Sequence, residues 1–391
     1  MILLACARAN IYSKWGIMLT AAHALEFAVT ATGFEDFGPD GYQEGIERTL
    51  DAFESAPITP NAREAAGLRL IVDLCTRLRI EQWYKEHPEI SNLPIEGPFL
   101  VCGLPRTGTT ATVGMLALDA RFRFLRTWEA VRPVPPPRIA NELDDPRAIA
   151  ARQAARNYAK PTQHIHDPDG PEEDLALLAG LNMHAYHGRY PMPQSFLDWW
   201  IREDFGSTYA YHRRVLRLLE SERPPHLWLL KAPVHLFKLE TFAAEYPGAR
   251  FIMTHRDPAK VIPSVSSLFF TMHSEHCAPG ALNKLTFGPA LLAFWQQGMQ
   301  RALEARQRIG EHRFIDLWND ELAGQPIETF RKLYERLDFE PGPELNAKLE
   351  DYRRKHAPEG AGKHRYSAEE YGLTGPQIRA AFSDYVERFH L

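Results

Sequence analysis

The sequence predicts an α/β fold, a P-loop-like three-layer arrangement with a mostly parallel central sheet and an N-terminal helical layer. Two observations carry this prediction. In PFLVCGLPRTGTT, which starts at Pro98, a buried apolar strand runs into a glycine-spaced turn and then a helix start. Further along the chain, short apolar runs alternate with helical stretches, as in sheets whose parallel strands are joined by crossover helices. A length of 391 residues accommodates one large α/β domain with an appendage.

Composition narrows the class of protein. A formal net charge of −5 argues against a surface that coats nucleic acid. The 4 cysteines are widely spaced and form no C-x-x-C pair, which indicates reduced thiols and neither a disulfide framework nor a zinc site. We expect a cytoplasmic protein without a signal peptide or membrane span, because no apolar run reaches about 18 residues. Met1 and Met18 are both acceptable start residues.

Residues 1–95 are predicted to form an N-terminal helical segment that packs on the core. Leu68, Ile71, Cys75 and Leu78 recur at three- and four-residue steps, which places them on one helix face until Pro88 ends the run. A stripe of this kind is typical of structural cover. A contact between two copies in a homodimer is the alternative use of this layer.

Residues 96–391 are predicted to form the catalytic domain. After the strand that begins at Pro98, apolar runs at 226–230, 250–254 and 314–317 read as strands, with a helix after Pro326. Arg106, Lys231 and Arg256 each follow the end of a strand. Ligands of parallel sheets bind at the carboxyl ends of the strands, so we expect these three cations on one rim. A solvated surface lysine is the alternative for Lys231.

An insert at about 130–225 interrupts this domain. It opens with the stiff segment Pro133–Pro137, and the stretch from Tyr186 to Tyr211 is crowded with aromatic side chains. Aromatic residues fit a flat acceptor molecule as well as they fit a core. The insert is therefore either structural core or the wall of an acceptor pocket.

The turn after Pro98 has the spacing of a phosphate-binding loop. Gly103 and Gly108 hold the two glycine positions of G-x-x-x-x-G-K-[ST], and Thr110 holds the hydroxyl position. Thr109 stands where the lysine that reaches the β- and γ-phosphates belongs. Such a loop can still hold a phosphate with main-chain N–H groups, but it is poorly equipped to hydrolyse ATP. The alternative is a helix-capping turn that binds nothing.

The motifs LPRTGTT and THRDPAKVIPSVSSL, in this order, resemble the sulfotransferases that use 3′-phosphoadenosine 5′-phosphosulfate, or PAPS. The similarity extends over about residues 96–370, and the bacterial branch related to protein-tyrosine sulfotransferases is the most similar variety. The resemblance implies that Arg256 and Ser264 bind the 3′-phosphate. It also implies that the first motif binds the 5′-phosphosulfate, with the ligand residues Arg106, Thr107, Gly108, Thr109 and Thr110. Asp257 is expected to cap the following helix while Arg256 faces the ligand.

The resemblance implies in-line transfer of the sulfuryl group from PAPS to a hydroxyl of a small or medium acceptor. By analogy with phosphoryl transfer, such a site positions its partners and neutralises charge, and no metal is required if Arg106 and Lys231 do so. We therefore expect an enzyme that uses PAPS and needs no metal. We also expect that it does not bind nucleic acid and has no membrane span. The alternatives are a kinase-type phosphotransferase and a nucleotide-binding regulatory protein without chemistry.

The general base has two candidates. The K-T-H histidine of cytosolic sulfotransferases is absent, because Ala232 and Pro233 follow Lys231. The protein-tyrosine branch uses a glutamate about twenty residues after the loop, which makes Glu129 the first candidate and a salt bridge with Arg126 or Arg132 its alternative. His235 is the second candidate, since on a helix it would share a face with Lys231; a packing role is its alternative.

A basic run lies late in the chain, where cytosolic members of the family close the 3′-phosphate site with an R-K-G loop. This chain lacks that string and carries Lys363, His364 and Arg365 instead. The three residues either form a basic flap over the donor or belong to a solvated charge run.

Overall fold

The computed structural model describes residues 19–157, 167–182, 186–355 and 367–391. The chain divides into two compact units. The helical unit comprises Met1–Ile95, Arg126–Pro225 and Thr271–Leu282. The sheet unit comprises Glu96–Leu125, His226–Phe270 and Asn283–Leu391. The helical unit therefore includes, besides residues 1–95, the aromatic-rich insert and a short segment at 271–282.

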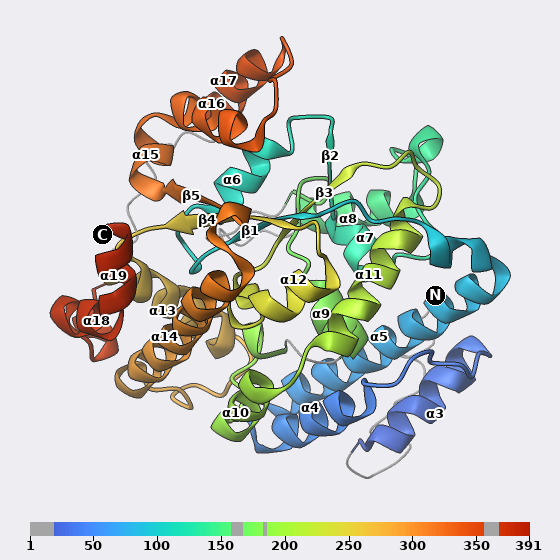
Figure 1. Ribbon diagram of the computed structural model, residues 1–391. Coiled ribbons are helices and arrows are strands. Elements are labelled where there is room, and N and C mark those ends of the chain that lie inside the picture. The colour runs from blue at the N-terminus through green and yellow to red at the C-terminus, as the bar shows by residue number, and fades with distance from the viewer. Residues whose placement is uncertain (1–18, 158–166, 183–185, 356–366) are drawn as a thin grey trace. The chain divides into compact units, whose positions relative to one another are not determined.

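The described part of the helical unit is built from helices and irregular segments (Figure 1). Its elements are α3 (Ala21–Thr32), α4 (Gln43–Ser55), α5 (Pro60–Glu86), η1 (Pro88–Asn92), α7 (Thr127–Val131), η2 (Ile139–Asn141), α8 (Pro146–Asn157), α9 (Leu175–Asn182), η3 (Tyr186–Gly188), α10 (Gln194–Arg202) and α11 (Gly206–Glu220). The local sequence explains the start of helix α5, because the Thr59 side chain accepts the Ala62 N–H and Pro60 occupies the first turn. Of the predicted face, Ile71, Cys75 and Leu78 are fully buried, whereas Leu68 is only partly buried.

The sheet unit has the elements β1 (Phe99–Cys102), α6 (Thr109–Leu116), β2 (Phe122–Phe124), β3 (Leu227–Lys231), η4 (Pro233–Phe237), α12 (Leu239–Glu245), β4 (Arg250–His255), α13 (Pro258–Ser274), α14 (Lys284–Ile309), η5 (Glu311–Arg313), β5 (Phe314–Trp318), α15 (Asn319–Gly324), α16 (Pro326–Leu337), α17 (Leu345–Lys355), η6 (Glu369–Tyr371), α18 (Gly375–Ala381) and α19 (Ser383–Phe389). Helix α13 begins in this unit and ends in the helical unit.

Its five strands, in the order β2-β3-β1-β4-β5, pair in parallel throughout the described residues. Strand β1 lies in the middle, with β3 on one side and β4 on the other. The predicted α/β class and parallel sheet are therefore confirmed.

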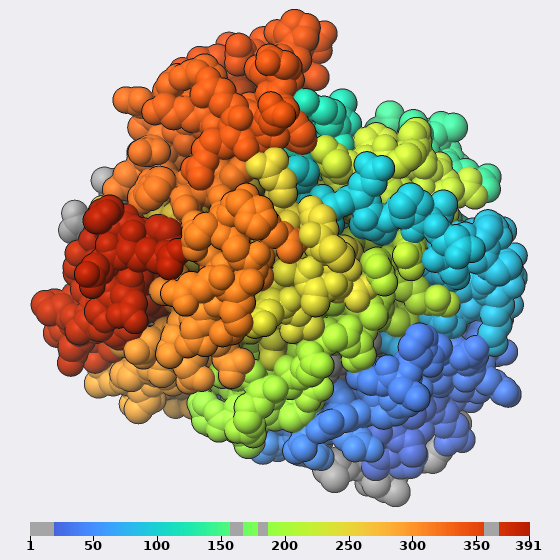
Figure 2. Space-filling view, viewed as in Figure 1, coloured from blue at the N-terminus to red at the C-terminus, as the bar shows by residue number. Residues whose placement is uncertain are grey.

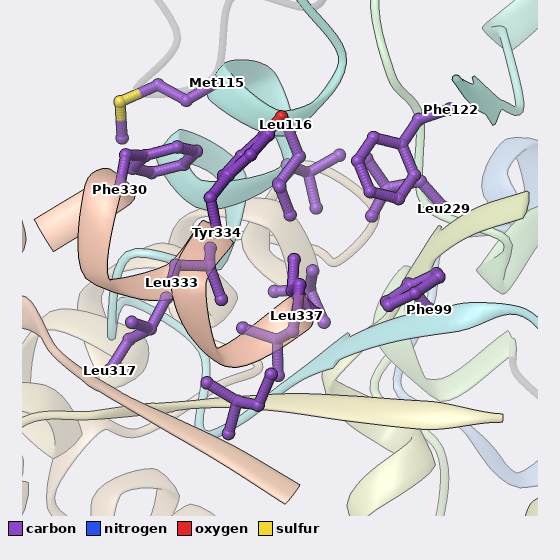
Figure 3. Close-up of a cluster of buried hydrophobic side chains, with 14 of the residues drawn as sticks. Phe99, Met115, Leu116, Phe122, Leu229, Leu317, Phe330, Leu333, Tyr334 and Leu337 are labelled. Carbon is purple, nitrogen blue, oxygen red and sulfur yellow. The ribbon is translucent and has the colours of Figure 1, made fainter. Parts of the chain in front are cut away.

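Alternate residues of the strands supply the cores on the two faces of the sheet. On one face, Val101, Ile252 and Ile315 join a buried cluster with side chains of α6, α16 and α17. Figure 3 shows Leu333 and Leu337 of α16 pointing toward this sheet face. On the other face, Phe251 stacks on Phe314, with ring centroids 4.7 Å apart. This second face also meets α12, α14 and α19, so the sheet unit has three layers.

Two further expectations concern thiols and membranes. Among the described residues Cys75, Cys102 and Cys277 are free thiols, and burial raises the pKa of Cys102 to about 12, which keeps this thiol neutral. No helix in the described ranges is both long and apolar enough to cross a bilayer.

Candidate phosphate-binding site

The candidate site lies at the carboxyl ends of three neighbouring strands in the sheet unit. The loop that carries Arg106 follows β1, Lys231 is the last residue of β3, and Arg256 comes directly after β4. Because β3, β1 and β4 are adjacent and parallel, the structure brings the three cations to one edge of the sheet. This is the arrangement that the sequence predicted.

The loop backbone depends on its two glycines. Gly103 has φ +143°, and a Cβ atom there would lie 2.6 Å from the Thr254 carbonyl oxygen. Gly108 has φ +101° and caps the start of α6. Arg106 adopts φ 69°, a left-handed conformation that is uncommon outside glycine and marks local strain. The tight turn places the main-chain N–H groups of the first turn of α6 at the strand edge, where they suit an anion.

Thr107 braces this loop from inside. Its hydroxyl is completely buried and donates to the Leu104 carbonyl at 2.6 Å. The hydroxyl oxygen of Thr254 lies 2.6 Å from the hydroxyl oxygen of Thr107, and this contact ties the loop to β4. The side chain of Thr107 is therefore engaged within the protein, and its main-chain N–H is the group left for a ligand contact.

The residues of the two sequence motifs meet at this edge. Arg106 Nε donates to Ser264 Oγ at 3.3 Å, and Arg256 Nη1 donates to the Arg106 carbonyl at 3.0 Å. The Nε of Arg256 is buried and has no hydrogen-bond partner among the described residues. A buried guanidinium N–H without an acceptor is unfavourable unless an anion supplies one. The arrangement fits a phosphate bound between Arg256 and the buried hydroxyl of Ser264.

Lys231 is also part of this edge. Only 5% of the residue is exposed, which rules out the solvated surface lysine considered from the sequence. Its Nζ lies 3.5 Å from the hydroxyl of Thr110, in the first turn of α6. The ammonium group is therefore placed beside the phosphate-binding loop.

Asp257 caps the helix that carries Ser264, as predicted. Its Oδ1 accepts the Ala259 N–H at 2.9 Å, and α13 begins at Pro258. Its Oδ2 accepts a hydrogen bond of 2.6 Å from Arg379, which belongs to α18. The side chain of Asp257 is thus occupied by the protein while the neighbouring Arg256 faces the loop.

The two candidate bases lie in different units. Glu129 belongs to the helical unit, is 1% exposed, and accepts the Arg126 main-chain N–H at 3.0 Å at the start of α7. The Arg126 guanidinium pairs with Glu142. A capping role for Glu129 thus accompanies any chemical role, and the carboxylate is held in one orientation.

His235 does not have the helical relation to Lys231 that the sequence suggested. Lys231 ends β3, whereas His235 lies in the 3₁₀ turn η4, so the two residues do not share a helix face. The imidazole is fully buried and packs edge-on against Phe242, with ring centroids 5.3 Å apart. This environment favours the packing role. The other basic candidates, Lys363, His364 and Arg365, lie outside the described residues.

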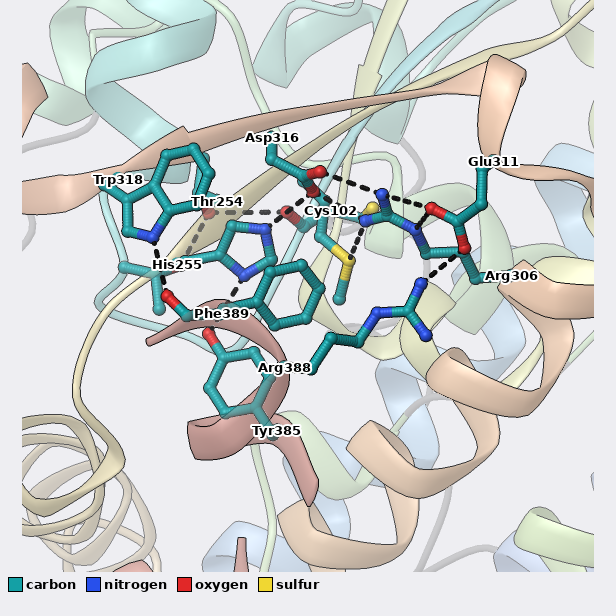
Figure 4. Close-up of polar contacts among 12 residues, drawn as sticks. Cys102, Thr254, His255, Arg306, Glu311, Asp316, Trp318, Tyr385, Arg388 and Phe389 are labelled. Carbon is teal, nitrogen blue, oxygen red and sulfur yellow. Dashed lines mark hydrogen bonds and ion pairs between the residues drawn. The ribbon is translucent and has the colours of Figure 1, made fainter. Parts of the chain in front are cut away.

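A buried polar network behind Arg256 was not foreseen from the sequence (Figure 4). His255 Nε2 lies 2.8 Å from Asp316 Oδ1, and Arg306 binds both oxygens of Asp316, at 2.6 and 2.8 Å. Burial lowers the pKa of His255, and its hydrogen bond to Asp316 offsets only part of this effect. Burial acts to raise the pKa of Asp316, but hydrogen bonds from Arg306 and His255 outweigh it and hold that pKa below its usual value. Asp316 is therefore an ionised acceptor and His255 a neutral imidazole at pH 7.

A five-stranded parallel sheet with a glycine-spaced loop after its central strand and cations on the flanking strand ends defines a protein of the P-loop-like class. Residues 98–342 match the sulfotransferase family, and this is more than half of the chain. The chain belongs to the sulfotransferase family. It is a sulfotransferase enzyme, which confirms the predicted class.

Mycobacterial sulfotransferases are among its relatives. The chain is 26% identical over 287 residues to the omega-hydroxy-beta-dihydromenaquinone-9 sulfotransferase Stf3 of Mycobacterium bovis, over 71% of each chain. The crystal structure of sulfotransferase STF9 from Mycobacterium avium superposes with a TM-score of 0.89 at 29% identity, over 96% of this chain and 97% of that one. For STF1 from Mycobacterium tuberculosis H37Rv the TM-score is 0.80 at 27% identity, over 94% and 99%.

Proposed function

We propose that this sulfotransferase takes its sulfuryl group from PAPS and transfers it to a hydroxyl of a small or medium acceptor. The observation that carries the choice of donor is the buried Arg256 Nε, which has no hydrogen-bond partner among the described residues. Arg256 and Ser264 are suited to a 3′-phosphate, which ATP does not have. Thr109 replaces the lysine of the triphosphate loop, and this also favours the sulfotransferase donor over a kinase donor.

The cations at the sheet edge have separate tasks in this proposal. PAPS supplies the sulfuryl group on its 5′ side, and the main-chain N–H groups of residues 107–110 hold that side at the start of α6. Lys231 and Arg106 offset the negative charge that develops on the sulfuryl oxygens and on the bridging oxygen. In this proposal the two side chains supply the positive charge that a metal would otherwise supply.

Removal of the acceptor proton requires a base. Glu129 is our first choice because its carboxylate is buried and oriented by the Arg126 N–H. His235 is the second choice, and its buried packing against Phe242 weighs against it. In this scheme Glu129 takes the proton from the acceptor hydroxyl as the new oxygen–sulfur bond forms, while the bond between the sulfur and the bridging oxygen of PAPS breaks and adenosine 3′,5′-bisphosphate leaves.

The relatives suggest which acceptors to test first. Stf3 is named for an omega-hydroxylated dihydromenaquinone, so a compound of this kind is the first acceptor to test with this chain. Simple phenols and alcohols complete the panel. A cytoplasmic location and a homodimer stay predictions from the sequence.

The activity test uses PAPS with this acceptor panel and measures both adenosine 3′,5′-bisphosphate and the sulfated product. We expect Glu129→Gln to lower kcat by about 10²-fold or more with little change in the KM for PAPS, because glutamine can still accept the Arg126 N–H. Glu328→Gln, on an exposed part of α16, is the matched control. A normal kcat in Glu129→Gln together with a low kcat in His235→Gln would move the base to His235. Failure of the wild-type enzyme to form the bisphosphate with every acceptor would contradict the proposal.

A further inference from the structure

The C-terminal helices contact three consecutive residues, His255, Arg256 and Asp257, of which the middle one is the candidate phosphate ligand. Phe389 of α19 stacks on the His255 ring, with centroids 3.8 Å apart. Tyr385 of α19 lies beside the Arg256 main chain, and Arg379 of α18 bonds Asp257. Figures 1 and 2 show these helices, in dark red, lying against the orange helix α14. The end of the chain thus forms part of the support for Arg256.

The Tyr385 hydroxyl joins the main chain of Arg256 to the side chain of His255. The residue is 1% exposed, and its oxygen lies 3.4 Å from the Arg256 main-chain nitrogen and 3.3 Å from His255 Nδ1. A main-chain N–H can only donate, so the tyrosine oxygen accepts from Arg256. The Asp316 carboxylate can only accept, so the neutral His255 ring has its hydrogen on Nε2, and Nδ1 accepts the tyrosine hydrogen.

One tautomer of His255 therefore serves both contacts. Its ring hydrogen is on Nε2, which lies 2.8 Å from the acceptor Asp316 Oδ1, while Nδ1 accepts the tyrosine hydrogen. Arg306 and His255 both donate to this carboxylate. Each group in the chain from Arg256 N–H through Tyr385 and His255 to Asp316 therefore has one consistent hydrogen-bonding role (Figure 4).

We propose that Tyr385, held by His255 and Asp316, is a positioning residue that sets the main chain of Arg256 for recognition of the 3′-phosphate. The inference rests on the proposed function of Arg256. The Arg256 guanidinium is held at its other end by the Arg106 carbonyl, 3.0 Å from Nη1. With the main chain and the guanidinium both held, little orientation remains to be fixed when phosphate binds, and this preorganisation favours affinity.

The test compares two ligands that differ in the 3′-phosphate. Adenosine 3′,5′-bisphosphate and adenosine 5′-phosphate are titrated by calorimetry into the wild-type enzyme and Tyr385→Phe. Tyr334→Phe is the matched control, because Tyr334 is also buried and donates to Asp119 at 2.8 Å, on the other face of the sheet. We expect Tyr385→Phe to weaken bisphosphate binding by about tenfold, equivalent to about 1.4 kcal/mol, and to leave 5′-phosphate binding unchanged. Tyr334→Phe should change neither affinity.

A second variant covers the case in which Tyr385→Phe does not fold. Arg379→Gln removes the bond to Asp257 from a partly exposed side chain, and we expect a selective loss of about threefold for the bisphosphate. A wild-type preference for the bisphosphate that persists unchanged in the folded variants would overturn the positioning role and leave the proposed donor intact. A wild-type enzyme that does not distinguish the two ligands would overturn both.

Discussion

Arg256 has two sets of hydrogen bonds that act on different parts of the residue. Its main-chain N–H is held by Tyr385, and its Nη1 is held by the Arg106 carbonyl. The buried Nε has no hydrogen-bond partner among the described residues. The planar fork of arginine makes this division possible, and a lysine at the same position has only one donor group at its tip. A lysine at position 256 could therefore not make the same set of contacts.

The side chain of Thr107 is expected to contribute more to the stability of the protein than that of nearby Thr110. Thr107→Val keeps the shape of the side chain but removes the hydroxyl bonded to Leu104 and Thr254, which should lower the free energy of unfolding by about 1–3 kcal/mol. Thr110→Val removes the hydroxyl of an exposed residue, with its long contact of 3.5 Å to Lys231 Nζ, and should change this free energy by less than about 0.5 kcal/mol. Urea unfolding of both variants measures the difference. Equal effects would show that the hydroxyl of Thr107 does not brace the loop.

At the scale of elements, the C-terminal segment approaches α14 closely enough to require glycine. A Cβ atom on Gly288 of α14 would lie 2.1 Å from the carbonyl oxygen of Tyr371, at the end of η6. Gly372, which follows, has φ +68° and lies against the Leu285 main chain. The two backbones meet directly, which fixes the segment that leads into α18 and α19.

We therefore expect Gly288→Ala to lower the free energy of unfolding by about 2–3 kcal/mol, because the helix and η6 must separate to admit the methyl group. Gly324→Ala is the control, since a Cβ atom at the end of α15 meets nothing within 4 Å. That change should be neutral or stabilising by up to about 1 kcal/mol. Chemical denaturation monitored by tryptophan fluorescence compares the two. A stable Gly288→Ala variant would show that this contact is not tight.

The elements also show what the sequence could predict. Strands β1, β3, β4 and β5 coincide with apolar runs that stand out in the sequence. Strand β2 was not predicted, because it has only three residues and its central one is Arg123. That arginine is buried at the sheet, with its guanidinium 4.6 Å from the Trp228 ring centroid. A cation stabilised by an aromatic neighbour far along the chain leaves no local pattern to detect.

In the whole molecule, the candidate site also has a part that the sequence predicts and a part that it does not. Arg106, Lys231 and Arg256 were predictable because each follows an apolar run, and parallel pairing brings strand ends together. The support behind Arg256 was not predictable. Tyr385 and Asp316 lie 130 and 61 positions from His255 in the sequence. Only the folded sheet unit brings these residues together, and their separate sequence surroundings give no sign of a shared role.

In the proposed function, Arg256 recognises a 3′-phosphate of the donor. The most direct test is a calorimetric titration of wild type and Arg256→Ala with adenosine 3′,5′-bisphosphate, and separately with ATP and magnesium. We predict that the wild type prefers the bisphosphate and that Arg256→Ala weakens its binding by about 30-fold, since a charged hydrogen-bonding group contributes about 2 kcal/mol. Tighter binding of ATP, insensitive to Arg256, would contradict the account and favour a phosphotransferase.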